Sequence, residues 1–186
     1  MNTGTIILIV IAVLVVLLII WYFATYNSLI DLRNRKDDQW SQIDVQLKRR
    51  ADLIPNLVET VKGYTKHGKG TLEEVVKARN SFVTASTPEE EMKASGEITQ
   101  ALNKLFALSE SYPDLKANQN FIGLQNDLKE TEDKISAARQ FYNDTVLTYN
   151  NKVEMVPSNI VARMAGFKTA TYFEVNEEDR KNVKVS

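Results

Sequence analysis

Cysteine is absent from this chain, histidine occurs once, and proline and glycine are scarce. Its 186 residues include four prolines and seven glycines. Without cysteine there can be no disulfide, no cysteine-ligated zinc, no iron–sulfur cluster and no thiol nucleophile. His67 alone is too little for a common transition-metal site, and interaction with a helix terminus is the simpler role for it. So little proline and glycine excludes a collagenous or low-complexity chain and suits long helices.

An excess of charge of one sign is also missing, because 23 basic side chains balance 24 acidic ones. Such a chain has no strong field to attract nucleic acid, so we expect no nucleic-acid partner. Residues 68–71 (GKGT) lack the frame of a phosphate-binding loop, and no serine, threonine or lysine lies in a recognisable nucleophile motif. The acidic groups at 89–91 and 177–179 can bind a divalent cation only weakly, and a charged helix start and a solvated tail are the simpler interpretations. We therefore expect no enzymatic activity, no cofactor and no metal site.

What the chain does have is a run of apolar and aromatic residues from 6 to 24, ahead of its first charged side chain, Asp31. A helix of these 19 residues covers about 28 Å, close to the hydrocarbon thickness of a bilayer. A cleaved export signal would have a positive N-terminal region and a shorter apolar core, whereas residues 1–5 carry no charged side chain. Trp21 and Tyr22 suit the headgroup layer. The pattern predicts an uncleaved signal-anchor, with the lipid bilayer as the partner of residues 6–24.

The flanks of the apolar run indicate which side of the membrane the rest of the chain occupies. Arg33, Arg35 and Lys36 follow the run, and no lysine or arginine precedes it. Basic flanks stay in the cytoplasm. We expect a single-pass protein of the cell (inner) membrane with a cytoplasmic C-terminal part, the extracytoplasmic side remaining the alternative.

Beyond the membrane the first pattern is a long amphipathic helix. Its apolar residues recur mostly at spacings of three, four or seven, and they are Leu29, Leu32, Trp40, Ile43, Leu47, Ile54, Leu57, Val58, Val61 and Tyr64. No proline or glycine separates this stripe from the apolar run, so one helix is expected to continue from the membrane, with a bend just before Pro55. The glycines at 68 and 70 predict its end.

Three further helices and a short fourth follow from capping signals and heptads. Thr71 with Glu74, and Thr87 with Glu90, match the capping box and predict two helix starts, joined either as a hairpin or as a kinked continuation. A long helix is expected from near Asn118 to just before residue 157. Its apolar residues are seven apart, at Phe121, Leu128, Ile135, Tyr142 and Tyr149. A short helix over 159–165 should end at Gly166, and residues 169–175 should be extended, ahead of a charged tail.

These elements predict an all-α fold. A transmembrane helix continues into an antiparallel up-and-down four-helix bundle with coiled-coil-like packing, followed by a short extra helix and an extended tail. The predicted domains are an N-terminal segment over 1–26, a bundle domain over 27–166 and a C-terminal segment over 167–186.

Several sequence blocks also resemble a known family. They are residues 40–50 (WSQIDVQLKRR), 52–64 (DLIPNLVETVKGY), 112–118 (YPDLKAN), 138–143 (ARQFYN) and 157–159 (PSN). Together they resemble the LemA family of bacterial membrane proteins, over nearly all of the chain from 26 to 174. One departure is Gly68, where the family more often has an acidic residue after the histidine. The resemblance implies a single-pass N-terminal anchor and a helical bundle, and it implies no established activity, cofactor or substrate.

Three charged residues lie on or beside the apolar stripes. Arg50 occupies the same heptad position as Ile43 and Leu57, and Glu132 lies seven residues before Arg139 beside the stripe of the last long helix. Either the stripes drift and these residues are exposed, or they form a polar layer between helices in which Glu132 pairs with a basic residue of the first helix. Tyr142 and Tyr149 are most simply core residues with polar tips.

The leading hypothesis for function is a non-enzymatic, membrane-anchored scaffold that forms homo-oligomers. Its predicted self-association face is the mixed polar side of the first helix, made of Gln39, Gln42, Asp44, Gln46, Lys48, Arg49 and Asp52. The second hypothesis is an adaptor that presents its tail or a helical groove to another membrane protein, such as a protease or a signalling component. The third is a small-ligand sensor, which large side chains at the stripe positions disfavour.

Overall fold

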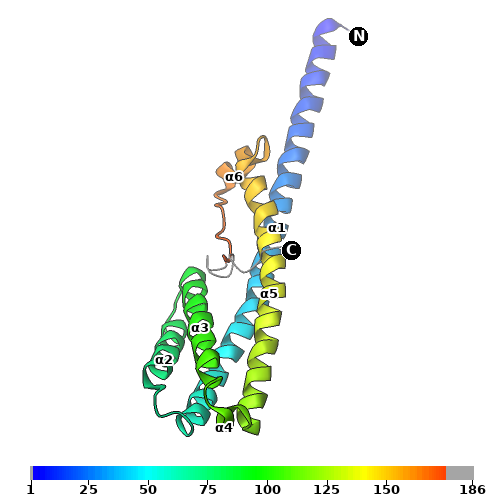
Figure 1. Ribbon diagram of the computed structural model, residues 1–186. Helices are drawn as coiled ribbons and strands as arrows, with labels where there is room; N and C mark the ends of the chain where they lie inside the picture. The colour runs from blue at the N-terminus through cyan, green and yellow to red at the C-terminus, as the bar shows by residue number, and fades with distance from the viewer. Residues whose placement is uncertain (1, 175–186) are drawn as a thin grey trace, which may run out of the picture. The chain divides into compact units, whose positions relative to one another are not determined.

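The computed structural model describes residues 2–174, and all regular structure within that range is helical (Figure 1). The helices are α1 (Thr3–Lys62), α2 (Lys69–Val83), α3 (Pro88–Ser109), α4 (Pro113–Lys116), α5 (Gln119–Glu154) and α6 (Ser158–Ala165). The predicted all-α class is confirmed. Residues 169–174 of the predicted extended segment form neither helix nor strand. Val175 and the tail, with its acidic group at 177–179, lie outside the described residues.

α1 contains both the apolar run and the amphipathic stripe, and it is one unbroken helix as predicted. It continues through Pro55. Its apolar part is long and apolar enough to cross a membrane, and none of that stretch is buried within the chain. The helix ends at Lys62, earlier than the glycines at 68 and 70 predict, and the amide of Tyr64 then bonds to the carbonyl of Val61 in a turn.

The predicted capping box at Thr71 is wrong. α2 already begins at Lys69, its N-cap is Gly68, and no side chain caps it. A Cβ on Gly68 would lie 2.9 Å from Leu108 Cδ2 and 2.9 Å from Thr65 Oγ1. Leu108 and Thr65 thus pack closely against Gly68, and the contact with the distant Leu108 cannot be read from a local capping pattern.

The capping box at Thr87 is confirmed as a helix start. Thr87 Oγ1 accepts a hydrogen bond from the amide of Glu90 at 3.2 Å, and Pro88 occupies the first turn of α3. The Glu90 carboxylate accepts from the amide of Ser86 at 2.9 Å, one residue before the position that the standard box uses.

Helices α2 and α3 fold back on one another as a hairpin, which decides between the two predicted connections (Figure 1). Lys104 near the end of α3 lies 3.1 Å from Glu74 near the start of α2. α5 begins close to the predicted position, since Asn118 Oδ1 accepts from the amide of Phe121 at 3.1 Å. Its five heptad residues from Phe121 to Tyr149 are all buried.

The described chain divides into two compact units, and α1 and α5 contribute to both. One unit combines residues 2–39 with 141–172, and the other combines 40–140 with 173–174. The core of the first unit consists of Leu29, Leu32, Tyr149, Val161, Ala162 and Phe167. The most deeply buried apolar residues of the second include Ile43, Leu47, Ile54, Leu57, Val61, Val75, Ile98, Leu105, Leu115 and Phe121.

In the first unit the segment after α6 is held by side chains of α5. The Tyr149 hydroxyl donates to the carbonyl of Lys168 at 2.7 Å, and the Tyr142 hydroxyl donates to the carbonyl of Thr171 at 3.1 Å. Asn150 binds Ala170 twice, through its Nδ2 to the carbonyl at 3.0 Å and through its Oδ1 from the amide at 2.8 Å. These bonds satisfy backbone groups that a sheet would otherwise pair. Both tyrosines are buried with bonded hydroxyls, as the sequence indicated.

Candidate functional site

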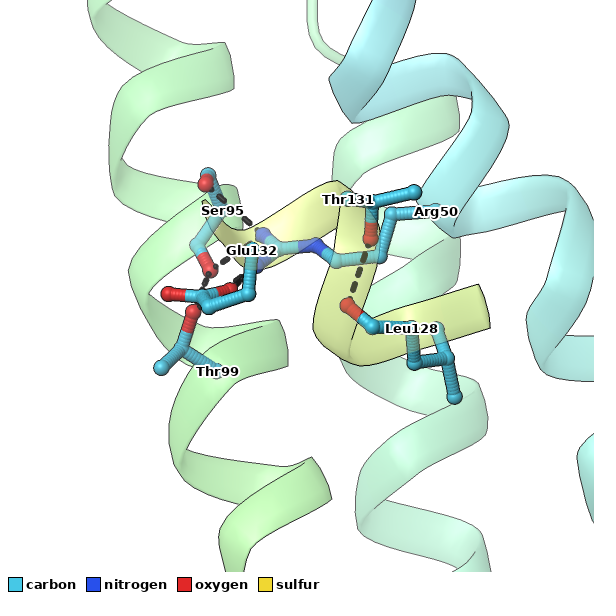
Figure 2. A network of polar contacts seen from close by, with 6 residues as sticks. All are labelled: Arg50, Ser95, Thr99, Leu128, Thr131 and Glu132. Carbon is cyan, nitrogen blue, oxygen red and sulfur yellow. Dashed lines mark hydrogen bonds and ion pairs between the residues drawn. The ribbon is translucent and has the colours of Figure 1, made fainter. Parts of the chain in front are cut away.

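The most deeply buried charge in the described chain belongs to Arg50, whose residue is 1% exposed. Its guanidinium extends from α1 between α3 and α5 (Figure 2). Nη1 donates to Glu132 Oε2 at 2.8 Å and to Thr99 Oγ1 at 2.9 Å. Nη2 donates to the carbonyl and the hydroxyl of Ser95 at 2.9 and 2.8 Å. Four hydrogen bonds from one side chain thus connect α1, α3 and α5 within the second unit.

Burial costs a charged group its hydration, and it lowers the pKa of Arg50 below its ordinary value, an effect that the Glu132 carboxylate opposes. Arginine remains charged in proteins, so the cost must be offset by partners. The carboxylate, two hydroxyls and one carbonyl supply them, while Arg50 Nε has none. The Glu132 side chain is 43% exposed, so one side of the ion pair still reaches water.

Of the three charged residues singled out in the sequence, the structure joins Arg50 and Glu132 directly. Arg139 lines a small cavity beside this pair, and its guanidinium carbon is 5.9 Å from the centre of the Phe173 ring. Ser95 and Thr99 were missed by sequence reasoning. A signal for them existed, because they fall at helical spacing between Met92 and Leu102 and thus interrupt an apolar stripe with two small hydroxyl residues.

A small cavity of about 30 Å³ adjoins this network, and Arg139 and Glu132 both contribute to its lining. That volume accommodates little more than one water molecule. We call this network the Arg50 junction, and the cavity beside it is too small for a metabolite. No cluster of three or more metal-ligating side chains occurs within residues 2–174.

A second polar contact joins α1 to the first turn of α3. Asp44 Oδ2 lies 2.8 Å from Lys48 Nζ, while Asp44 Oδ1 and Glu91 Oε2 are buried without a donor. Burial, together with hydrogen bonding to Asp44 and repulsion by its charge, raises the pKa of Glu91 to about 7 from an ordinary value of 4.5. Lys48 opposes the shift. A proton on Glu91 gives the two carboxyl groups the donor that they otherwise lack.

The predicted self-association face divides into an exposed and a partly buried half. Exposed residues are Gln42, Lys48 and Asp52, and half-buried residues are Gln39, Asp44, Gln46 and Arg49. Arg49 lies 3.6 Å from Glu130 of α5, so part of its charge is engaged within the chain. Val45 lies among the exposed residues, with 62% of its surface open.

A groove of about 810 Å³ lies between the end of α1 and one face of α2. Its apolar floor is formed by Val58, Leu72 and Val76, and its charged lining residues are Lys62, Lys66, Lys69, Lys77 and Glu73. Four lysines against one glutamate make it basic. An acidic group at this surface would be attracted, and apolar side chains could occupy the floor.

We expect Glu132→Ala to reduce the free energy of unfolding by about 1–2 kcal/mol, because the buried guanidinium then lacks a counter-charge while the hydroxyl partners remain. Denaturant unfolding followed by circular dichroism in detergent measures this. The control is Glu130→Ala on the same helix, which removes only exposed pairs to Arg49 and Lys134 and should cost less than about 1 kcal/mol. Equal stability of Glu132→Ala and the native protein would show that the junction contributes nothing.

Glu91 makes stability depend on pH in a direction opposite to most carboxylates. Its folded-state pKa is about 7 and its ordinary value is 4.5, so the folded state holds the proton more tightly. The stabilisation is full below about 4.5 and is lost as the pH rises through about 7.

Glu91→Gln keeps a neutral hydrogen-bonding side chain at every pH. We expect it to raise the melting temperature at pH 8 by a few degrees (about 2–4 °C per kcal/mol) and to flatten the decline between pH 5 and pH 8. Thermal scans at both pH values test this, with Glu89→Gln as the control because Glu89 is exposed in the same helical turn. If the melting temperature of Glu91→Gln fell between pH 5 and pH 8 as steeply as that of the native protein, the raised pKa of Glu91 would not be the cause of the decline.

Comparison with known proteins adds the family. Magnetosome protein MamQ 2 of Paramagnetospirillum magneticum is 28% identical over 192 residues, which cover 87% of this chain and 71% of that protein. Protein LemA of Metamycoplasma hominis is 27% identical over 169 residues, covering 89% and 76%. The model of the LemA family matches residues 39–186, a range that includes all four members of the Arg50 junction. Because this match extends over most of its length, the chain belongs to the LemA family.

Proposed function

We propose that this protein is a non-enzymatic scaffold, anchored in the bacterial cell (inner) membrane by α1 and self-associating through the exposed part of that helix. The proposal rests on one observation, that α1 combines a membrane-compatible stretch with a residue that holds other helices. The same helix contains an unburied stretch apolar enough to span a bilayer and the residue, Arg50, around which α3 and α5 are fastened. The non-enzymatic part rests on the sequence, which has one histidine, no cysteine and no nucleophile motif.

The proposal includes an antiparallel four-helix bundle formed by parts of α1, α2, α3 and α5. Arg50 connects three of them, and Arg79 of α2 donates to the carbonyl of Ala51 in α1 at 3.0 Å. The α2–α3 hairpin supplies one of the reversals of direction that an up-and-down bundle requires. The basic flank at Arg33, Arg35 and Lys36 supports a cytoplasmic position for the part that follows the span.

Self-association is proposed along the strip of α1 formed by Gln42, Val45, Lys48 and Asp52, which is narrower than the face predicted from the sequence. Copies anchored in one membrane point the same way, so equivalent strips meet at the same depth. Lys48 of one copy can then approach Asp52 of another around an apolar contact at Val45. Charge pairs of this kind give specificity and modest affinity.

A single introduced cysteine tests this directly, because the native chain has none. We expect Val45→Cys to form disulfide-linked dimers in membranes under mild oxidation. Val83→Cys on α2 is the matched control, since Val83 has similar exposure (59%) but lies outside the strip. Mass measurement in mild detergent accompanies the cross-linking. A strict monomer at high concentration, with equal cross-linking at both positions, would overturn the proposal.

A second candidate, the adaptor, is favoured by the groove between α1 and α2. Its apolar floor and four lysines fit an acidic amphipathic helix of a protein partner. In this role α1 would hold the groove near a membrane. The groove lysines would recognise the acidic charges of the partner helix, and the floor would contact its apolar side.

Photo-cross-linking tests the adaptor. We expect a benzoylphenylalanine at Val76 to give a discrete protein adduct in native membranes, and the double change Lys66→Glu with Lys77→Glu to reduce it at least tenfold. Lys134→Glu, an exposed change on α5, should leave the adduct unchanged. An adduct insensitive to the groove lysines would exclude charge recognition there.

A further inference from the structure

Large apolar side chains are open to solvent where α5 ends and α6 follows. Val156 is 79% exposed, Met164 72%, Met155 60% and Ile160 51%. Ile160 and Met164 are four residues apart and share one side of α6, while Val161 and Ala162 on its other side are buried in the core of the first unit. α6 is therefore apolar both toward the core and away from it. Such a patch on a folded protein indicates a surface that is covered in use.

The patch lies beside the part of α1 where the apolar run ends, and this position points to lipid as its covering. The core cluster that contains Val161 and Ala162 is packed against Trp21, Tyr22 and Tyr26 of α1. The ring centres of Tyr26 and Phe167 are 5.7 Å apart. Trp21 and Tyr22 belong to the apolar run itself, so α6 lies beside the end of the stretch that spans the bilayer (Figure 1).

Several basic side chains lie near the patch and suit lipid headgroups. Lys152, near the end of α5, donates to Ser28 Oγ at 2.6 Å, and the Arg33 guanidinium carbon lies 5.2 Å from the centre of the Phe167 ring. Arg163 and Lys168 are exposed on either side of Gly166. Long basic side chains can lay their apolar stems along the membrane boundary while their charges reach phosphate groups.

We propose that residues 155–157 and the outer face of α6 insert into the interfacial layer of the phospholipid bilayer, as a second membrane contact beside α1. This inference rests on the proposed membrane anchoring. The insertion is shallow, as for helices that lie in the plane of the interface. Two contacts restrict the tilt of the first unit relative to the membrane plane, whereas a single span leaves the unit free to tilt.

The test uses the full chain in phosphatidylcholine–phosphatidylglycerol vesicles, with one introduced cysteine at a time carrying an environment-sensitive fluorophore. The reporting positions are Val156→Cys and Met164→Cys, with Leu14→Cys in the apolar run as the anchor probe and Val83→Cys as the solvent control. Doxyl groups placed at shallow or deep positions on the lipid chains quench the fluorophore by contact. Circular dichroism and the solvent probe verify that each variant is folded.

We expect at least twofold quenching at positions 156 and 164 by shallow doxyl lipids, weaker quenching there by deep ones, deep quenching at Leu14 and none at Val83. Quenching at Leu14 without quenching at 156 and 164 would overturn the second contact and leave the anchor intact. If position 164 were instead cross-linked between copies and unquenched, a second copy would cover the patch and the proposal would be wrong. Absence of quenching at Leu14 would refute the anchor, and the second contact with it.

Discussion

A buried guanidinium is the constraint on which the arrangement of the second unit depends. Arg50 lies on the apolar side of α1, and removing its charge from water is costly unless nearly every N–H finds an acceptor. α3 supplies the carbonyl and hydroxyl of Ser95 with the hydroxyl of Thr99, and α5 supplies Glu132. Apolar side chains alone would tolerate sliding of the helices by a turn. The four hydrogen bonds of the Arg50 guanidinium do not tolerate such sliding, because they form only when the three helices keep one register.

The same helix has two parts that suit different solvents. Its first part is apolar on every side and suits lipid, where a helix satisfies all its own backbone groups. Its later part is amphipathic and acquires partners from the rest of the chain. No glycine interrupts α1 between Thr5 and Lys62, and its one proline, Pro55, leaves the helix continuous. The apolar stretch is therefore joined to the packed part of the chain by continuous helix, without a flexible linker.

Polar side chains also organise the end of the described chain. Within residues 2–174 the segment after α6 has no sheet to join, and the hydroxyls of Tyr142 and Tyr149 with the amide of Asn150 bind its backbone instead. Tyr142 and Tyr149 are one heptad apart on α5 and Asn150 follows Tyr149 directly, so their polar groups lie along the extended segment from Lys168 to Thr171. In both units, then, the apolar heptads bring elements together and a few polar bonds decide their alignment.

Much of this was accessible from the sequence, because it depends on neighbours along the chain. The apolar run, the helix start at Thr87 and the left-handed end of α6 at Gly166, with φ of 77°, follow from local chemistry and helical periodicity. The buried heptads of α5 follow for the same reason. The exposure of Met164 and the closeness of Asp44 to Glu91 had no local signature.

The sequence by itself therefore determined the five longer helices, most of their boundaries and the segment that suits a membrane, whereas the short α4 was not predicted. Only the tertiary structure decided that Arg50 is buried, that Ser95 and Thr99 accept its hydrogen bonds, and that the N-cap residue Gly68 packs against Leu108. The reason is physical. A helical pattern specifies the direction in which a side chain points, whereas its burial, its partners and its pKa depend on atoms that reach it from distant parts of the chain.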